Sequence, residues 1–303
     1  MNDVRTLAIA ALSVFFLAAC DSGTPEPAAS MDAAADSAAA VAPAVEVPTE
    51  TMGDDVYVVV AKDNPFFPVA AWEADGTVQM AMGSDAASAP DGAVTYEARQ
   101  VVWPTARVRV LHFAEETGGV LHPITDETIL YVQRGTATVG VGDATVTLAA
   151  GDVASFPSGA LRNAGAAADA TIVTWNAPSL TGEDTPTHVP GASVELRDLG
   201  FLGLKRYTFP GNSVRVAIQR AGLNSDPVTG RTDSLIYVTG GPMGFTENGQ
   251  AFTVSEGDFI REIAGLEHFW NVETESEFVT TSGKPLELEA IDPSQATDIP
   301  PAK

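Results

Sequence analysis

Short runs of alternating apolar and polar residues dominate the chain after its first fifty residues. Thr136–Val139 and Thr145–Leu148 alternate in this way with a Gly-Asp turn between them, and Arg107–His112 follows the same pattern. Because successive side chains of a β-strand point to opposite faces, this alternation predicts half-buried strands joined by tight turns. No segment after residue 20 has the 3.6-residue periodicity of a helix of useful length. The pattern therefore predicts an all-β protein.

One stretch of this pattern, residues 125–163, occurs a second time from residue 231 onward. Four landmarks recur in the second copy, and the residue numbers of each pair differ by 106. The pairs are Tyr131 and Tyr237, Gly135 and Gly241, Gly151 and Gly257, and Gly159 and Gly265. Four matches at one spacing, with no insertion between them, indicate an internal duplication and hence two related β-domains.

The second copy also carries a motif of glycines followed by a histidine. Gly257, Gly265, His268 and Asn271 stand close to the spacing of the second motif of the cupin superfamily, and the first copy has Arg162 where that motif has its histidine. The repeat thus resembles the cupins, which are small antiparallel β-barrels of the jelly-roll type. The resemblance implies two tandem cupin (jelly-roll) β-barrels, a bicupin.

The composition along the chain predicts five segments. Residues 1–20 form a signal peptide, and residues 21–55 form a disordered tether rich in Ala and Pro, because they have too few large apolar residues to fold. Residues 56–190 form an N-terminal barrel with leading edge strands, and residues 191–290 form a C-terminal barrel. Residues 291–303 form a flexible tail.

The first twenty residues have the features of a bacterial export signal. Arg5 precedes an apolar run, Leu7–Ala19, which is too short for an ordinary membrane span, and Leu-Ala-Ala-Cys resembles a lipobox ending at Cys20. Cys20 is the one cysteine of the chain, so we expect its lipidation and a lipoprotein anchored in the bacterial cell envelope that faces the periplasm. A plain secretory signal and an uncleaved anchor are the alternatives.

The metal-binding positions of the superfamily are mostly lost in both copies. Three histidines and a carboxylate hold a divalent ion in metal-dependent cupins, as the resemblance implies. The corresponding positions are His122, Ile124, Thr128 and Arg162 in the first copy, and Val228, Gly230, Ser234 and His268 in the second. Each barrel keeps one ligand of four, so we expect no metal site and no cofactor. A divalent metal in a non-standard site is the alternative.

In the first barrel, His122 and Glu127 are candidate catalytic residues, because a buried histidine beside a carboxylate is a credible general acid or base. Asp126 is an alternative partner for His122. Arg162 and Thr128 are candidate ligand-binding residues. A buried guanidinium needs an anionic partner, which is either Glu127 or the carboxylate, phosphate or enolate of a ligand.

In the second barrel, His268, Asp233 and Ser234 are the candidate ligand-binding residues. Asp226 and Asn224 are further oxygen-bearing neighbours that could join a non-standard site. The competing interpretation is that His268 hydrogen-bonds across the barrel as part of the core.

Charge restricts the partners of the chain. Acidic residues outnumber basic ones by 40 to 16, for a net charge of −24, so nucleic acids and anionic lipid surfaces are improbable partners. We expect a small organic ligand, anionic or carbohydrate-like, contact with the membrane through lipidated Cys20 alone, and pairing into a homodimer by analogy with other cupins. An enzyme of the cupin type (a lyase, isomerase or oxygenase) and an inert envelope scaffold are the alternatives.

Overall fold

The computed structural model describes residues 47–48, 50–75, 77–104, 106–117, 127–141, 144–157, 161–177, 186–209 and 212–282. The side chains of residues 77, 141, 144–145, 161–164 and 282 lie outside the description, although their backbone is included. The predicted signal peptide with Cys20, most of the tether and the tail also lie outside the described residues. So does His122.

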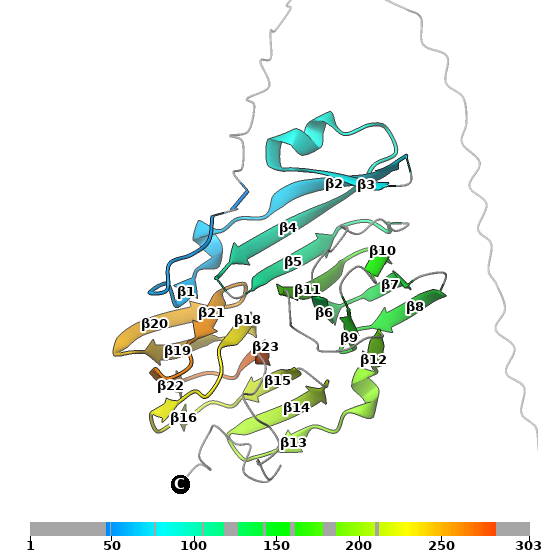
Figure 1. Ribbon diagram of the computed structural model, residues 1–303. Helices are drawn as coiled ribbons and strands as arrows, with labels where there is room; N and C mark the ends of the chain where they lie inside the picture. Colours follow the sequence, from blue (N-terminus) through cyan, green and yellow to red (C-terminus); the bar gives the residue numbers. More distant parts are fainter. Residues whose placement is uncertain are drawn as a thin grey trace, which may run out of the picture. The chain divides into compact units, whose positions relative to one another are not determined.

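The first half of the described chain forms a barrel of two antiparallel sheets (Figure 1). Its larger sheet has the strand order β12 (Thr187–Val189), β9 (Val153–Phe156), β6 (Glu127–Arg134), β11 (Ala170–Ala177), β5 (Arg107–Phe113), β4 (Val94–Val102), β2 (Phe67–Ala74) and β3 (Thr77–Met82). The smaller sheet has the order β10 (Leu161–Ala166), β7 (Thr136–Val141) and β8 (Ala144–Ala149). A 3-10 turn, η2 (Gly83–Ser88), follows β3.

The second half repeats this plan, which confirms two tandem barrels. One sheet has the order β1 (Val58–Val59), β21 (Phe259–Glu262), β18 (Ser234–Gly240), β23 (Ser276–Ser282), β15 (Ser213–Gln219), β14 (Leu202–Thr208) and β13 (Arg197–Asp198). The other has the order β16 (Leu223–Asn224), β22 (Glu267–Val272), β19 (Pro242–Glu247) and β20 (Gln250–Ser255), and β17 (Val228–Thr229) also pairs with β22. Strands β5, β7, β8, β9 and β10 recur as β15, β19, β20, β21 and β22 with both bounds shifted by 106.

A short strand completes one sheet of each barrel, and it comes from the segment that precedes the other barrel in sequence. β1 lies before the first barrel in sequence but pairs with β21 of the second, while β12 precedes the second barrel and pairs with β9 of the first. The segment 56–190, predicted for the first barrel, thus includes a strand that completes a sheet of the second.

Two aspartates at equivalent positions hold these exchanged strands. Asp258 accepts hydrogen bonds from the backbone N–H groups of Ala61 (2.6 Å) and Ser255 (2.8 Å), and Ala61 opens the 3-10 turn η1 (Ala61–Asp63). Asp152 accepts from the N–H of Gly191 (2.8 Å), the first residue of η3 (Gly191–Ser193), and its other oxygen lies 2.9 Å from His188 Nε2. These hydrogen bonds lower the pKa of Asp152, against the opposing effect of burial.

Apolar residues form three clusters, one inside each barrel and one between the barrels. Alternation along the strands separates them: Leu111 and Phe113 of β5 point into the first barrel, whereas Val108 and Val110 pack with residues of the second half. The indole N–H of Trp175 donates a hydrogen bond to the Leu235 carbonyl (3.2 Å), which ties the two halves through this middle cluster. The central strands of the larger sheets, such as β6, β11 and β18, are therefore buried on both faces.

Candidate functional site

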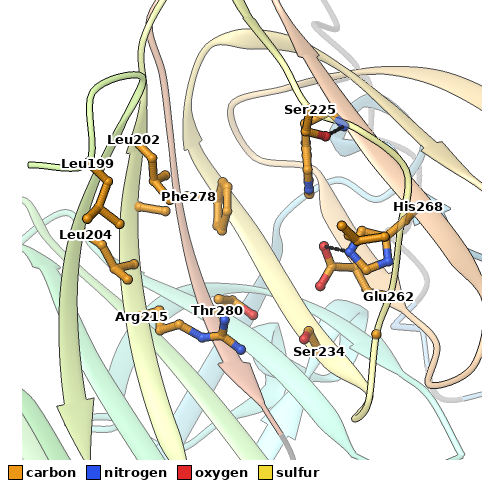
Figure 2. A pocket seen from close by; sticks show the side chains of 14 residues that line it. Leu199, Leu202, Leu204, Arg215, Ser225, Ser234, Glu262, His268, Phe278 and Thr280 are labelled. Atoms are coloured by element: carbon orange, nitrogen blue, oxygen red, sulfur yellow. Dashed lines mark hydrogen bonds and ion pairs between the residues drawn. The ribbon is translucent and has the colours of Figure 1, made fainter. Parts of the chain in front are cut away.

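The interior of the second barrel contains a cavity of about 70 Å³ (Figure 2). One part of its wall is apolar and consists of Leu199, Leu202, Leu204, Ala217, Val228, Trp270 and Phe278, and Gly230 also lines it. The rest is polar and consists of Arg215, Ser225, Ser234, Glu262, His268 and Thr280. A cavity with both kinds of wall suits a small ligand that has a charged and an aliphatic part.

The four positions that correspond to cupin metal ligands all lie on the wall of this cavity. They are Val228, Gly230, Ser234 and His268, so the structure brings together the residues that the motif spacing singled out. Val and Gly have no donor atom, and a hydroxyl with one imidazole is a poor donor set for Fe, Mn, Ni or Zn. These residues do not fit the metal of the cupins.

His268 lies between two carboxylates. Its Nδ1 is 3.8 Å from Oε2 of Glu247, and its Nε2 is 3.5 Å from Oε1 of Glu262. The two carboxylates approach different ring nitrogens, so they do not converge on one ligand atom. Throughout the described part of the chain, no group of three or more His, Cys, Asp or Glu side chains is arranged to hold a metal ion.

Glu247 is fully buried at the end of β19. Burial raises its pKa to about 7, and the nearby carboxylates of Glu262 and Asp233 act in the same direction. A hydrogen bond from the Ile263 N–H to its Oε1 (2.9 Å) and the charge of Arg261 lower the pKa and offset part of this shift. The carboxyl next to His268 therefore exchanges its proton near neutral pH.

A polar row crosses the inner face of the larger sheet of the second barrel. Glu262 of β21 lies opposite Ser234 of β18, and Thr280 of β23 lies opposite Arg215 of β15. These four strands are neighbours in the order β21-β18-β23-β15, and all four side chains line the cavity. Thr280 lies opposite Ile236, two residues beyond Ser234, so the row runs diagonally from an acidic end past two hydroxyls to a basic end.

A second arginine extends the basic end of the row. Arg206 of β14 lies directly opposite Arg215 in the β14–β15 ladder. Leu202 and Leu204 of the same strand line the cavity, so alternation places Arg206 on the inner face as well. The basic end of the row thus has two arginines on adjacent strands.

Asp233 lies on the other face of the sheet, away from the cavity. Its Oδ2 is 3.0 Å from Nη2 of Arg261, and its Oδ1 accepts a hydrogen bond from the Ala264 N–H (2.9 Å). Asp233 precedes Ser234, and the strand alternation that directs Ser234 inward directs Asp233 outward. Of the three residues predicted for the second barrel, Ser234 and His268 line the cavity and Asp233 does not.

The residues predicted for the first barrel are separated in the same way. Thr128 is buried on the inner face of β6 and accepts a hydrogen bond from the Asn176 side-chain amide (2.8 Å). Glu127 begins β6 on the opposite face and is half-buried. Arg162 belongs to β10, but its side chain lies outside the described residues, as does the whole of His122.

The first barrel has a related polar row in which an apolar residue replaces the acidic end. Arg109, Thr128 and Thr174 precede Arg215, Ser234 and Thr280 by 106 residues, but Glu262 corresponds to Phe156, which is buried in the apolar cluster. Arg109 Nε donates a hydrogen bond to Oε1 of Gln100 (2.8 Å). Burial, with the nearby charge of Arg107, lowers the pKa of Arg109 to about 10.

Sequence reasoning missed Arg206, Arg215 and Glu262. The 106-residue spacing could have indicated Arg215, because it pairs this residue with Arg109 and both lie in segments where apolar and polar residues alternate. Arg206 and Glu262 have no charged counterpart in the first copy, which has Gln100 and Phe156 there. Their inward orientation follows from strand register alone.

No helix within the described residues is long and apolar enough to cross a membrane.

Comparison with known proteins places the fold. No protein-family model and no curated protein sequence matches the chain. Among solved structures, the chain is similar to AerE from Microcystis aeruginosa (TM-score 0.54, 12% identity, 72% of this chain and 98% of that chain). It is also similar to Ylba from E. coli (TM-score 0.52, 16% identity, 64% and 84%) and to the oxalate decarboxylase of Lactobacillus farciminis (TM-score 0.52, 11% identity, 63% and 82%). At these identities the likeness shows the fold alone: the chain has the tandem-barrel fold of the cupin superfamily.

Proposed function

We propose that the second barrel binds a small organic anion. The observation that supports this most directly is the pair of arginines, Arg206 and Arg215, at opposed positions on the inner face of one sheet. Arg215 lines the cavity, where Ser234 and Thr280 add hydroxyl donors. A guanidinium binds a carboxylate through two parallel hydrogen bonds, so a carboxylate is the favoured anionic group.

The apolar wall and the volume limit the rest of the ligand. Leu202, Leu204 and Phe278 offer an apolar surface on the same side of the cavity as Arg215, as Figure 2 shows. The cavity of about 70 Å³ is roughly half the size of a ~150 Å³ cavity that holds benzene. A carboxylate with a short aliphatic chain, such as propionate or butanoate, matches both features better than a sugar does.

Calorimetric titration of the full-length protein with propionate and butanoate tests the proposal. We expect saturable binding that weakens by about tenfold or more in Arg215→Gln and in Arg206→Gln, because each variant loses a charge-assisted hydrogen bond. Arg197→Gln is the matched control, since Arg197 is exposed on β13. Equal affinity in all four proteins would contradict the proposal.

Acid–base catalysis on the bound anion is a second candidate function. It is favoured by His268, an imidazole on the cavity wall whose two ring nitrogens lie near the carboxylates of Glu247 (3.8 Å) and Glu262 (3.5 Å). The test is proton exchange at the carbon next to the carbonyl of 2-oxobutanoate in D₂O, followed by NMR. We expect exchange in the wild type that His268→Gln abolishes, and no exchange above the buffer rate would rule this function out.

We also propose that lipidated Cys20 anchors the protein in the cell envelope with both barrels in the periplasm. The Leu-Ala-Ala-Cys sequence after a short apolar run supports this placement. Metabolic labelling with an alkyne fatty acid tests it. We expect a labelled protein in the membrane fraction and an unlabelled one for Cys20→Ser; equal labelling of the two would exclude the anchor.

A further inference from the structure

The polar row of the second barrel ends in a negative charge as well as a positive one, and this goes beyond a simple anion site. Figure 2 shows Glu262 and Arg215 extending into the cavity from different sides, with Ser234 and Thr280 among the side chains between them. Three strand spacings of about 4.8 Å separate the two end strands, and the register steps by two residues between β18 and β23, so the Cα atoms of Glu262 and Arg215 are about 16 Å apart along the sheet. The two long side chains leave a gap between opposite charges.

We propose that this site selects a small zwitterion, with its carboxylate at Arg215 and its ammonium group at Glu262. The inference rests on the proposed anion site and names the class of its ligand: a small amino acid with a short aliphatic part. The hydroxyls of Ser234 and Thr280 lie where the middle of such a ligand passes, and Leu202 and Phe278 contact its aliphatic carbons.

The burial of Glu262 supports a cationic partner in addition to His268. Only 14% of the Glu262 side chain is exposed, and its Oε1 is 3.5 Å from His268 Nε2, beyond the ordinary length of a charge-assisted hydrogen bond. A largely buried carboxylate is costly unless it is paired and hydrogen-bonded. An ammonium group in the cavity supplies both the charge and the donors.

The first barrel shows that the acidic end is not a requirement of the fold. Its equivalent position is Phe156, inside the apolar cluster, while Arg109 and the two hydroxyl positions are kept. A carboxylate therefore distinguishes the second barrel from the first at the same point of the sheet. Because Glu262 repels a second carboxylate, the site also disfavours dicarboxylates.

Titration of the full-length protein with matched ligands at pH 7.5 tests the inference. The probes are alanine, propionate and ethylamine, and, one size larger, 4-aminobutanoate, butanoate and succinate. We expect the zwitterion of each set to bind about 10-fold to 100-fold more tightly than the carboxylate that lacks the amine, which corresponds to one hydrogen-bonded charge pair. Ethylamine and succinate should bind most weakly.

Glu262→Gln is the decisive variant, because it removes the charge and keeps the shape. We expect it to lose the preference for the zwitterion while its affinity for propionate and butanoate is kept or raised. Glu262→Phe, which copies the first barrel, should behave in the same way. Should both variants fail to fold, the wild-type series decides by itself.

The outcomes separate this inference from the proposed anion site. Equal binding of alanine and propionate, with no effect of Glu262→Gln on their ratio, would overturn the zwitterion inference and leave the anion site standing. Binding of none of the carboxylate-bearing probes would overturn both.

Discussion

Replacing Glu247 by Gln should change how the stability of the protein depends on pH. Glu247 is fully buried beside His268, and burial raises its pKa from 4.5 to about 7. Its Oε1 accepts the Ile263 N–H, a role that the amide oxygen of Gln can keep, whereas its Oε2 has no hydrogen-bond partner among the described residues. The substitution thus removes the titration with little change of packing.

The magnitude follows from proton linkage. Below pH 4.5 the carboxyl is protonated in both the folded and the unfolded chain, so the raised pKa has no effect on stability. Between pH 4.5 and about 7 the folded state binds a proton that the unfolded state has lost, so the free energy of unfolding falls as pH rises. At 1.36 kcal/mol per pKa unit, the total loss is about 3 kcal/mol.

Urea unfolding of the wild type and of Glu247→Gln at pH 4.5, 6 and 7.5 measures this effect. The free energy of the variant relative to the wild type should rise by about 3 kcal/mol across the series, because only the wild type loses stability through Glu247. Glu256→Gln, at an exposed position, is the control for the loss of one carboxylate. A difference that stays constant within about 0.5 kcal/mol would refute the assigned cause of the raised pKa.

Three further substitutions test the fold. Asp258→Ala leaves the N–H groups of Ala61 and Ser255 without an acceptor, so it should cost about 2 to 4 kcal/mol in urea unfolding, whereas Asp198→Ala, which removes an exposed ion pair with Arg220, should cost much less. Trp175→Phe removes one of the hydrogen bonds between the barrels and part of a fully buried ring, so it should cost about 1 kcal/mol or more; unchanged stability would show that this bond contributes nothing. Gly135→Ala should lower the melting temperature, since φ is +78° and the new Cβ would lie 2.9 Å from Ala170; a rise would contradict this geometry.

The strand pattern and the duplication were readable in the sequence for physical reasons. Alternation such as Thr136–Val139 has to match the two faces of a strand, and glycines such as Gly151 and Gly257 adopt positive φ that other residues rarely accept. These local constraints repeat at the same spacing in both copies. The spacing of the histidine motif also led to the cavity wall. It singled out Ser234 and His268, and both line the cavity.

Which charged groups meet inside the barrel was decided by tertiary structure. Arg206 and Glu262 are 56 residues apart and become parts of one polar row only through the order of strands β21-β18-β23-β15-β14. Asp233 is adjacent to Ser234 in sequence, yet a shift of one residue along a strand sends its side chain to the opposite face.

The sequence by itself determined the all-β class and the two copies, because both depend on residue type at a local spacing. Tertiary structure alone decided the exchange of β1 and β12 and the cavity with opposite charges at its two ends. Strand pairing and barrel closure join residues far apart in the chain, and no local spacing encodes which of them come to face one another.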